Sequence, residues 1–151
     1  MKQYIRSMKI EKFLNQNPSF QIVVAGNAIF QKVSEGLAGH ELGMMDALIL
    51  VAIFFENDKA ARPTQLKEAF GIPKANVSHS IRALEKKKLL KRSIHDSDAR
   101  GYVLDLTPKG ARTAVEVISY FDKLQGRIER KCDAKSLDSF HRTLAALASV
   151  H

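Results

Sequence analysis

The stretch from Arg62 to Gly110 decides the fold: RPTQLKEAFGIPKANVSHSIRALEKKKLLKRSIHDSDARGYVLDLTPKG. Apolar residues recur at intervals of three and four in its first half, which indicates helices. Near its end, two short apolar runs flank a charged loop, which indicates a hairpin. The pattern predicts, in order, a helix over 63–70, a turn at Gly71-Ile72, a helix over about 74–88, and strands near 89–94 and 102–106. This order is typical of a helix-turn-helix with a β-hairpin wing.

The second of these helices separates into two faces. Val77, Ile81 and Leu84 repeat at helical spacing and are expected to bury against Leu66 and Phe70. The opposite face is polar and cationic: Ala75, His79, Arg82 and Lys86, flanked by Asn76 and Ser78. Donors, acceptors and cations are what the major groove of DNA selects, because base edges carry hydrogen-bonding groups and the flanking phosphates are anionic.

Nine residues are therefore predicted to contact double-stranded DNA: Thr64, Lys74, Asn76, Ser78, His79, Arg82, Lys86, Asp98 and Arg100. Residues 74–79 begin the second helix, and the N-terminal half of such a helix usually enters the groove. Arg82 and Lys86 are expected at phosphates or outer base edges. For any single residue of this set, a solvated helix face is the alternative interpretation.

The hairpin loop supplies the last two members of that set. Arg100 suits the narrow, electronegative minor groove beside the major-groove site. Asp98 can hold the guanidinium in place before DNA arrives, which reduces the entropy that binding must overcome. An exposed ion pair without function is the alternative.

The rest of the chain is expected to be helical, so the fold class is mainly α with a small β-hairpin wing. Thr107-Pro108 begins a long helix to about 131, because threonine can cap it and proline fits its first turn. Asp133 can cap the last helix. Earlier helices are expected over 3–16, 20–37 and 43–56. Asn17-Pro18 separates the first two of them, because proline disfavours helix at the residue before it. The helix over 43–56 is apolar on nearly every side, which is typical of a helix at the centre of a core.

The helices outside the winged helix carry more apolar surface than that small domain needs. We therefore divide the single domain of 1–151 into a DNA-binding winged-helix region over 44–110 and a helical dimerisation region over 1–40 and 111–151. Packing of these helices on each other within one monomer is the alternative.

Composition and charge agree with a nucleic-acid partner. The 151 residues carry a net charge of +8 with a pI of about 9.7, which suits nucleic acid better than the alternative partner, an anionic membrane surface. No apolar run reaches membrane-spanning length, and no signal core follows the N-terminus. The lone Cys132 excludes an internal disulfide and indicates a reducing compartment, so a cytoplasmic location is expected.

Other chemistry finds little support in the sequence. There is no nucleophile elbow, Gly-rich phosphate loop or metal-ligand cluster, so no enzyme activity, cofactor or metal is expected. His40-Glu41 with the distant His141 has no assignable ligand spacing. Cys132 is more often an inert apolar residue than a redox sensor. An anionic-ligand pocket is one interpretation of four basic residues near the C-terminus, although exposed helix faces explain them equally: Arg127, Arg130, Lys131 and Arg142.

The decisive stretch resembles the MarR family of bacterial transcription regulators. The most specific part is the Asp98-Ala99-Arg100 wing followed by Leu104-Asp105-Leu106-Thr107-Pro108-Lys109-Gly110. The resemblance is strong over 62–110 and extends to about 42–150 by the order and length of the elements. Residues 1–40 match only in that helices precede the winged helix.

The resemblance implies a homodimer on a pseudo-palindromic operator, acting as a repressor that a small aromatic or anionic effector releases from DNA. The sequence departs from the family pattern at three positions. Pro73 stands where a capping serine is frequent, His79 where arginine is frequent, and Gly101 where a polar or basic side chain is common. A winged helix that binds protein rather than DNA is the alternative function.

Overall fold

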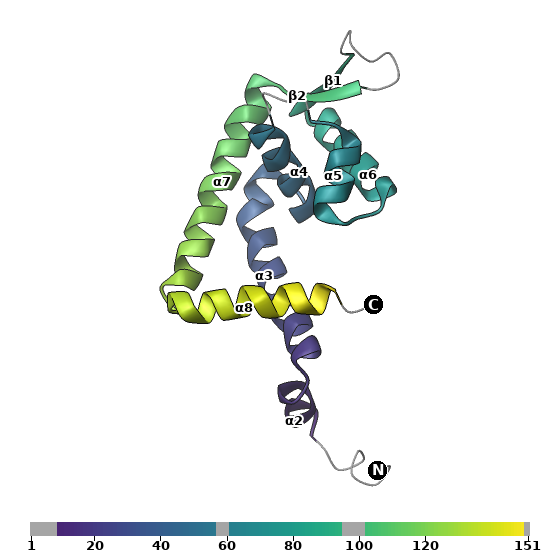
Figure 1. The fold of residues 1–151 in the computed structure, drawn as a ribbon. Helices are drawn as coiled ribbons and strands as arrows, with labels where there is room; N and C mark the ends of the chain where they lie inside the picture. Colours follow the sequence, from purple (N-terminus) through teal and green to yellow (C-terminus); the bar gives the residue numbers. More distant parts are fainter. Residues whose placement is uncertain (1–8, 57–60, 95–101, 150–151) are drawn as a thin grey trace. The chain divides into compact units, whose positions relative to one another are not determined.

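The computed structural model describes residues 9–56, 61–94 and 102–149. Over these residues it confirms a mainly helical fold with one two-stranded antiparallel hairpin (Figure 1). The elements are α2 (Ile10–Asn15), α3 (Pro18–Leu37), the 3₁₀ helix η1 (Ala38–His40), α4 (Met44–Phe55), α5 (Pro63–Phe70), α6 (Lys74–Lys86), β1 (Leu90–Ile94), β2 (Tyr102–Leu106), α7 (Pro108–Glu129) and α8 (Ala134–Ala148).

The chain divides into two compact units. Gly36–Arg127 forms the winged-helix unit, and Met1–Glu35 with Ile128–His151 forms the terminal-helix unit. Both α3 and α7 cross the boundary between them. The division therefore runs within two helices and not through loops.

The winged-helix unit has a closed apolar core with α4 at its centre. Ala47, Ile49, Leu50 and Ile53 of α4 are buried, as expected of a helix that is apolar on nearly every side. Around them are buried the side chains of α5, α6, the hairpin and α7: Leu66, Val77, Ile81, Leu84, Val103, Leu104, Ala114 and Val117. In Figure 1, α4 and α6 lie side by side beneath the hairpin.

The hairpin pairs in a single register, from Leu90 opposite Leu106 to Ile94 opposite Tyr102. Ala61 adds a bridge to the outer edge of β2, where the Leu104 N–H donates to the Ala61 carbonyl at 3.0 Å. The sequence did not reveal this bridge, because a single paired residue leaves no periodic pattern. It anchors the start of α5 against the hairpin.

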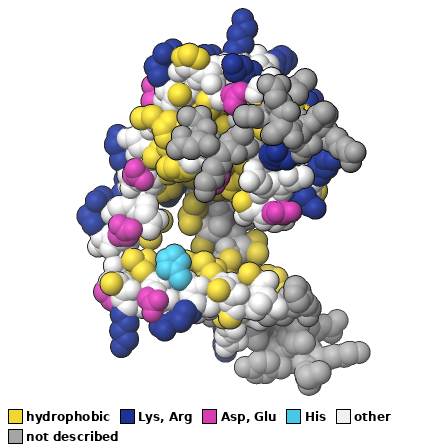
Figure 2. All heavy atoms as spheres, turned by 45° about the horizontal axis from the view of Figure 1, so that its top comes forward, with side chains coloured by type: hydrophobic (Ala, Val, Ile, Leu, Met, Phe, Trp, Pro, Cys, Tyr) yellow, Lys and Arg dark blue, Asp and Glu magenta, His cyan; other side chains and the backbone are white. Residues whose placement is uncertain are grey.

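The terminal-helix unit has little core of its own. Of the large apolar side chains of α3, Phe20, Val23, Val24 and Phe30 are about half exposed, and Phe140 on α8 is similar. Figure 2 shows hydrophobic side chains along α8 on the surface. The apolar surface expected on these helices is thus present, and several of its large side chains are about half exposed.

Asp133 caps α8, as predicted. Its carboxylate accepts the Ser136 backbone N–H at 2.8 Å and the Ser136 hydroxyl at 2.9 Å. The backbone N–H of Ser136, followed by its hydroxyl, lowers the pKa of the Asp133 carboxyl below its ordinary 3.8. The cap fixes where the last helix begins.

Several boundaries differ from the expected ones. The helix expected over 3–16 is described only as α2, since residues 1–8 lie outside the described part. Helix α3 runs through Gly36, where a Cβ would overlap the ring of Tyr120. Helix α6 ends at Lys86, two residues earlier than predicted, because Lys88 adopts a left-handed conformation that cannot continue the helix.

No single helix among the described residues is both long and apolar enough to cross a membrane. The α3–η1 segment and α4 pass a test of length and composition only when taken together, as a pair bent at the break between them.

Candidate nucleic-acid interface

The two predicted faces of α6 are confirmed by burial. Val77, Ile81 and Leu84 are fully buried. The residues of the opposite face are exposed, with Ser78 half-buried among them: Lys74, Ala75, Asn76, His79, Arg82 and Lys86. The helix therefore presents hydrogen-bonding and cationic groups along one side while its other side holds it in the core.

Pro73 precedes the first turn of α6 and supplies no side-chain cap. Its carbonyl accepts the Asn76 N–H at 3.0 Å and the Val77 N–H at 3.4 Å, which starts the helical ladder. The first N–H groups of a helix have no intrahelical acceptor, and they carry the positive end of its dipole. Where a capping hydroxyl is absent, a DNA phosphate is a suitable acceptor.

The other end of α6 closes in a Schellman motif. The Lys88 N–H donates to the Glu85 carbonyl at 2.8 Å, and the Leu89 N–H donates to the Leu84 carbonyl at 3.0 Å. Lys88 has a φ of 58°, the left-handed conformation in which glycine is usual. The apolar contact that accompanies this motif is available, because Leu84 and Leu89 are both buried.

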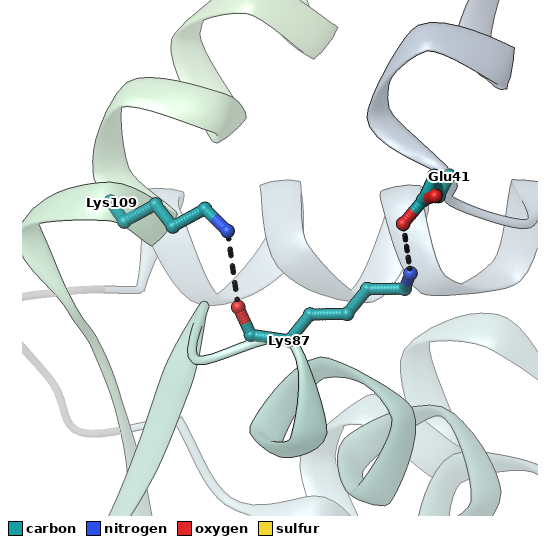
Figure 3. Close-up of polar contacts among 3 residues, drawn as sticks. All are labelled: Glu41, Lys87 and Lys109. Atoms are coloured by element: carbon teal, nitrogen blue, oxygen red, sulfur yellow. Dashed lines mark hydrogen bonds and ion pairs between the residues drawn. The ribbon is translucent and has the colours of Figure 1, made fainter.

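The Thr107-Pro108-Lys109-Gly110 segment donates hydrogen bonds to the carbonyls of the turn after α6 that the Schellman motif does not use. The Thr107 hydroxyl donates to the Lys88 carbonyl at 2.8 Å, and the Lys109 ammonium donates to the Lys87 carbonyl at 3.3 Å (Figure 3). Gly110 is buried so close to Leu89 that a Cβ would overlap the Leu89 carbonyl oxygen. Residues 107–110, the last part of the family-like pattern, therefore hold the turn that follows α6.

Thr107 also caps α7, as its sequence position predicts. Its hydroxyl oxygen accepts the Gly110 N–H at 3.0 Å. One side chain thus starts α7 and terminates the turn after α6, which couples the two helices at a single point.

Arg92 connects the recognition helix to the hairpin. Its guanidinium donates to the Glu85 carboxylate of α6 at 2.8 Å and lies 4.6 Å from the centre of the Tyr102 ring on β2. This role was not predicted from the sequence, because the contact depends on how β1 packs beside α6. The seven-residue separation of Glu85 from Arg92 across a turn was the only signal available.

The remaining predicted contacts divide by position. Thr64 is exposed in the first turn of α5. Lys86 is exposed at the end of α6 and lines a cavity there. Asp98 and Arg100 lie outside the described residues.

Metal and thiol chemistry gain no support from the described part of the chain. No group of three or more His, Cys, Asp or Glu residues in it is placed to hold a metal ion. The His40 Nδ1 atom lies 3.6 Å from the Glu116 carboxylate, and Cys132 is exposed.

The comparison with known proteins agrees with this geometry. The MarR family model matches residues 50–102, from α4 to the start of β2. No significant match to a curated protein sequence is found.

Solved structures match most of the chain at low identity. The Staphylococcus aureus MepR–DNA complex superimposes with a TM-score of 0.82 at 18% identity, covering 88% of this chain and 95% of that one. MarR from Oenococcus oeni PSU-1 gives 0.78 at 19% identity, covering 89% and 100%. CouR from Rhodococcus jostii RHA1, bound to p-coumaroyl-CoA, gives 0.78 at 17% identity, covering 91% and 96%.

The resemblance seen in the sequence is therefore confirmed: residues 50–102 match the MarR family of transcription regulators, and the chain has the MarR winged-helix fold.

Proposed function

We propose that this protein is a homodimeric, sequence-specific regulator of transcription that binds double-stranded DNA. The observation that carries the proposal is the division of α6 into a fully buried apolar face and an exposed face of hydrogen-bonding and cationic side chains. A helix held in this way can enter a major groove without loss of its packing. A solved structure of the same fold, MepR, is described as a complex with DNA.

The residues of α6 take different parts in this proposal. Lys74, Asn76 and His79 stand on the exposed face at the N-terminal half, which suits contact with base edges, and Ser78 lies beside them. Arg82 and Lys86 stand further along that face, which suits contact with phosphate oxygens. Thr64, in the first turn of α5, suits a phosphate contact, and Asp98 with Arg100 would act from the wing in the minor groove.

The proposed dimer rests on the terminal-helix unit. Exposed apolar side chains on α3 and α8, such as Val23, Phe30 and Phe140, are expensive to leave in water and suit burial against a second copy. A two-fold dimer presents two copies of α6 and therefore reads a pseudo-palindromic operator. We further propose that it acts as a cytoplasmic repressor without enzyme activity, released by a small effector.

A protein-binding winged helix is supported less well. The core of a protein interface is depleted of charged residues and enriched in aromatic ones. The exposed face of α6 has no aromatic side chain other than His79 and carries Lys74, Arg82 and Lys86. Its composition favours a polyanion.

The test is selection of bound duplexes from a random DNA library by the full chain. We expect an enriched, two-fold symmetric sequence, and affinity that falls steeply with salt because phosphate binding releases counterions. The Arg100→Ala variant should bind this sequence about 10-fold or more weakly, since a charge-assisted contact is worth about 1.5–3 kcal/mol. Lys123→Ala, an exposed position on α7, serves as the control.

Absence of any enriched sequence together with a flat salt response would exclude the proposed function. Enrichment with unchanged affinity in Arg100→Ala would exclude only the wing contact.

A further inference from the structure

A cavity of about 800 Å³ lies inside the winged-helix unit at the C-terminal end of α6. Its walls come from residues 39–41 after α3, from Ala83 and residues 86–89 at the end of α6, and from Lys109 and Thr113 on α7. Cavities of this size hold small-molecule ligands in many proteins. None of these wall residues belongs to the first half of α6, which carries the proposed base contacts.

The cavity is strongly basic. Four of its ten lining residues are lysines, namely Lys86, Lys87, Lys88 and Lys109, and Glu41 is the one acid among the ten. His40 at the rim lies 3.6 Å from the Glu116 carboxylate. Ammonium groups gathered from two helices and a turn repel one another, and a bound anion would relieve that repulsion.

Lys88 occupies a position that is unfavourable for lysine. Its φ of 58° is left-handed, and a glycine would adopt it without steric cost. Glu41, on the opposite wall, is also left-handed, with a φ of 53°. Folding of this turn alone would therefore favour glycine over lysine at position 88.

Two of the four lysines, Lys87 and Lys109, make polar contacts that a bound anion could replace. The Lys87 ammonium donates to the exposed Glu41 carboxylate at 3.2 Å, and the Lys109 ammonium donates to the Lys87 carbonyl at 3.3 Å (Figure 3). Both contacts are solvent-accessible, so neither contributes much to stability. An anion in the cavity could replace both partners with stronger ones.

We propose that this cavity binds a small, multiply charged, non-aromatic anion, such as a phosphate ester or a polycarboxylate. Several lysines favour more than one negative charge, because each acts as a point charge toward phosphate or carboxylate oxygens. The apolar part of the lining is Ala83 and Leu89, with no aromatic ring among the ten residues to stack on a ligand ring. Given the proposed DNA binding, occupancy would also release the Lys87–Glu41 and Lys109–Lys87 contacts and so change the hold on the end of α6.

The binding test uses the full chain without DNA, titrated by calorimetry with inorganic pyrophosphate and, separately, with citrate at constant ionic strength. Pyrophosphate or citrate should bind the wild type, and preference between them distinguishes phosphate from carboxylate chemistry. Lys88→Gly should weaken that binding about 10-fold, as loss of one charge-assisted hydrogen bond does. Lys109→Gln should weaken it similarly.

Lys88→Gly separates binding from folding. Glycine relieves the left-handed turn, so this variant should melt about 2–4 °C higher than the wild type while binding the anion less well. Lys74→Gln, at the other end of α6, and Lys123→Gln on α7 are the matched controls and should bind pyrophosphate as the wild type does. Equal weakening in these controls would overturn the proposal, because it would mean diffuse attraction to a basic surface. Failure of both anions to bind at millimolar concentration would overturn it as well.

The regulatory part is tested by repeating the DNA titration with and without pyrophosphate at matched ionic strength. The wild type should change its operator affinity and Lys88→Gly should not. An identical response in both variants would exclude coupling through the cavity, and it would leave DNA binding itself established.

Discussion

The winged-helix unit and the terminal-helix unit bury their apolar side chains to different extents. In the first, Leu50, Ile53, Val77 and Leu84 are fully buried. In the second, residues of the same type such as Val23 and Phe30 are more than half exposed. The proposed dimer accounts for this contrast, because a second copy would cover the exposed apolar side chains of the terminal-helix unit.

The largest effect is expected from charges placed on the exposed surface of α3. The double variant Val23→Glu/Phe30→Glu should be monomeric, because two copies would bring four carboxylates into one apolar interface. Its operator affinity should fall at least about 100-fold, since the two half-sites would no longer be bound together. Light scattering gives the oligomeric state and a mobility-shift titration gives the affinity.

Val115→Glu is the matched control for this experiment. Val115 is 52% exposed, as Phe30 is, but it belongs to the winged-helix unit. We expect it to stay dimeric. A double variant that remains a dimer at micromolar concentration would place the interface elsewhere.

The second prediction tests how tightly the winged-helix unit is packed. Gly110→Ala would place a methyl group onto the Leu89 carbonyl oxygen and so force apart the turn after α6 and the start of α7. The free energy of unfolding should fall by about 2–3 kcal/mol, the usual cost of overpacking. Denaturant unfolding measures it.

Gly39→Ala sharpens the same point. A Cβ at Gly39 meets nothing within 4 Å, so its effect should stay within about 0.5 kcal/mol. Equal effects of the two substitutions would show that the close approach at Gly110 is not a constraint on folding.

In both units, features that are set within a single element could be predicted from the sequence. Burial of Val77, Ile81 and Leu84 could be predicted, because helical periodicity within one element carries that information. The caps at Thr107 and Asp133 could be predicted for a similar reason, since each cap bonds a residue three positions ahead.

Contacts between distant segments could not be predicted in this way. The Thr107 hydroxyl reaches a carbonyl 19 residues earlier, and Glu41 reaches Lys87 across 46 residues. The Leu-Thr-Pro-Lys-Gly pattern at 106–110 is part of the resemblance to the MarR family, but the sequence did not show that it holds the turn after α6. Such roles depend on which elements pack together, and the apolar periodicity of a single element does not encode that.

The third prediction concerns a link of this kind, between α6 and the hairpin. Arg92→Glu should weaken operator binding about three- to tenfold, because the contacts with Glu85 and Tyr102 that hold the hairpin against α6 are lost. The free energy of unfolding should change by less than about 1 kcal/mol, since both side chains of the pair remain partly exposed to solvent. Fluorescence anisotropy with labelled operator measures the affinity.

The exchanged pair Glu85→Arg/Arg92→Glu distinguishes positioning from direct contact with DNA. If Arg92 acts through Glu85, the exchange should recover most of the lost affinity. If affinity stays as low as in the single variant, Arg92 contacts phosphate itself and the positioning role is wrong.

The smallest effect belongs to the terminal-helix unit and depends on pH. The backbone N–H and hydroxyl of Ser136 lower the pKa of the Asp133 carboxyl below 3.8, so its ionised form is favoured in the folded state. The contribution of this cap is therefore complete above pH 3.8 and is lost as the pH falls through the lower, folded-state pKa. The protection of the Ser136 amide from hydrogen exchange should decrease over that range.

Asp133→Asn isolates this step, because asparagine also caps helices but does not titrate. The variant should keep its protection at neutral pH and lose the acid-dependent decrease. Asp138→Asn, which removes a carboxylate paired with Arg142 elsewhere on α8, should keep that decrease. If protection of the Ser136 amide decreased equally in the Asp133→Asn variant, other carboxylates would cause the acid sensitivity of α8. The Asp133 cap would then not stabilise the terminal-helix unit in a pH-dependent way.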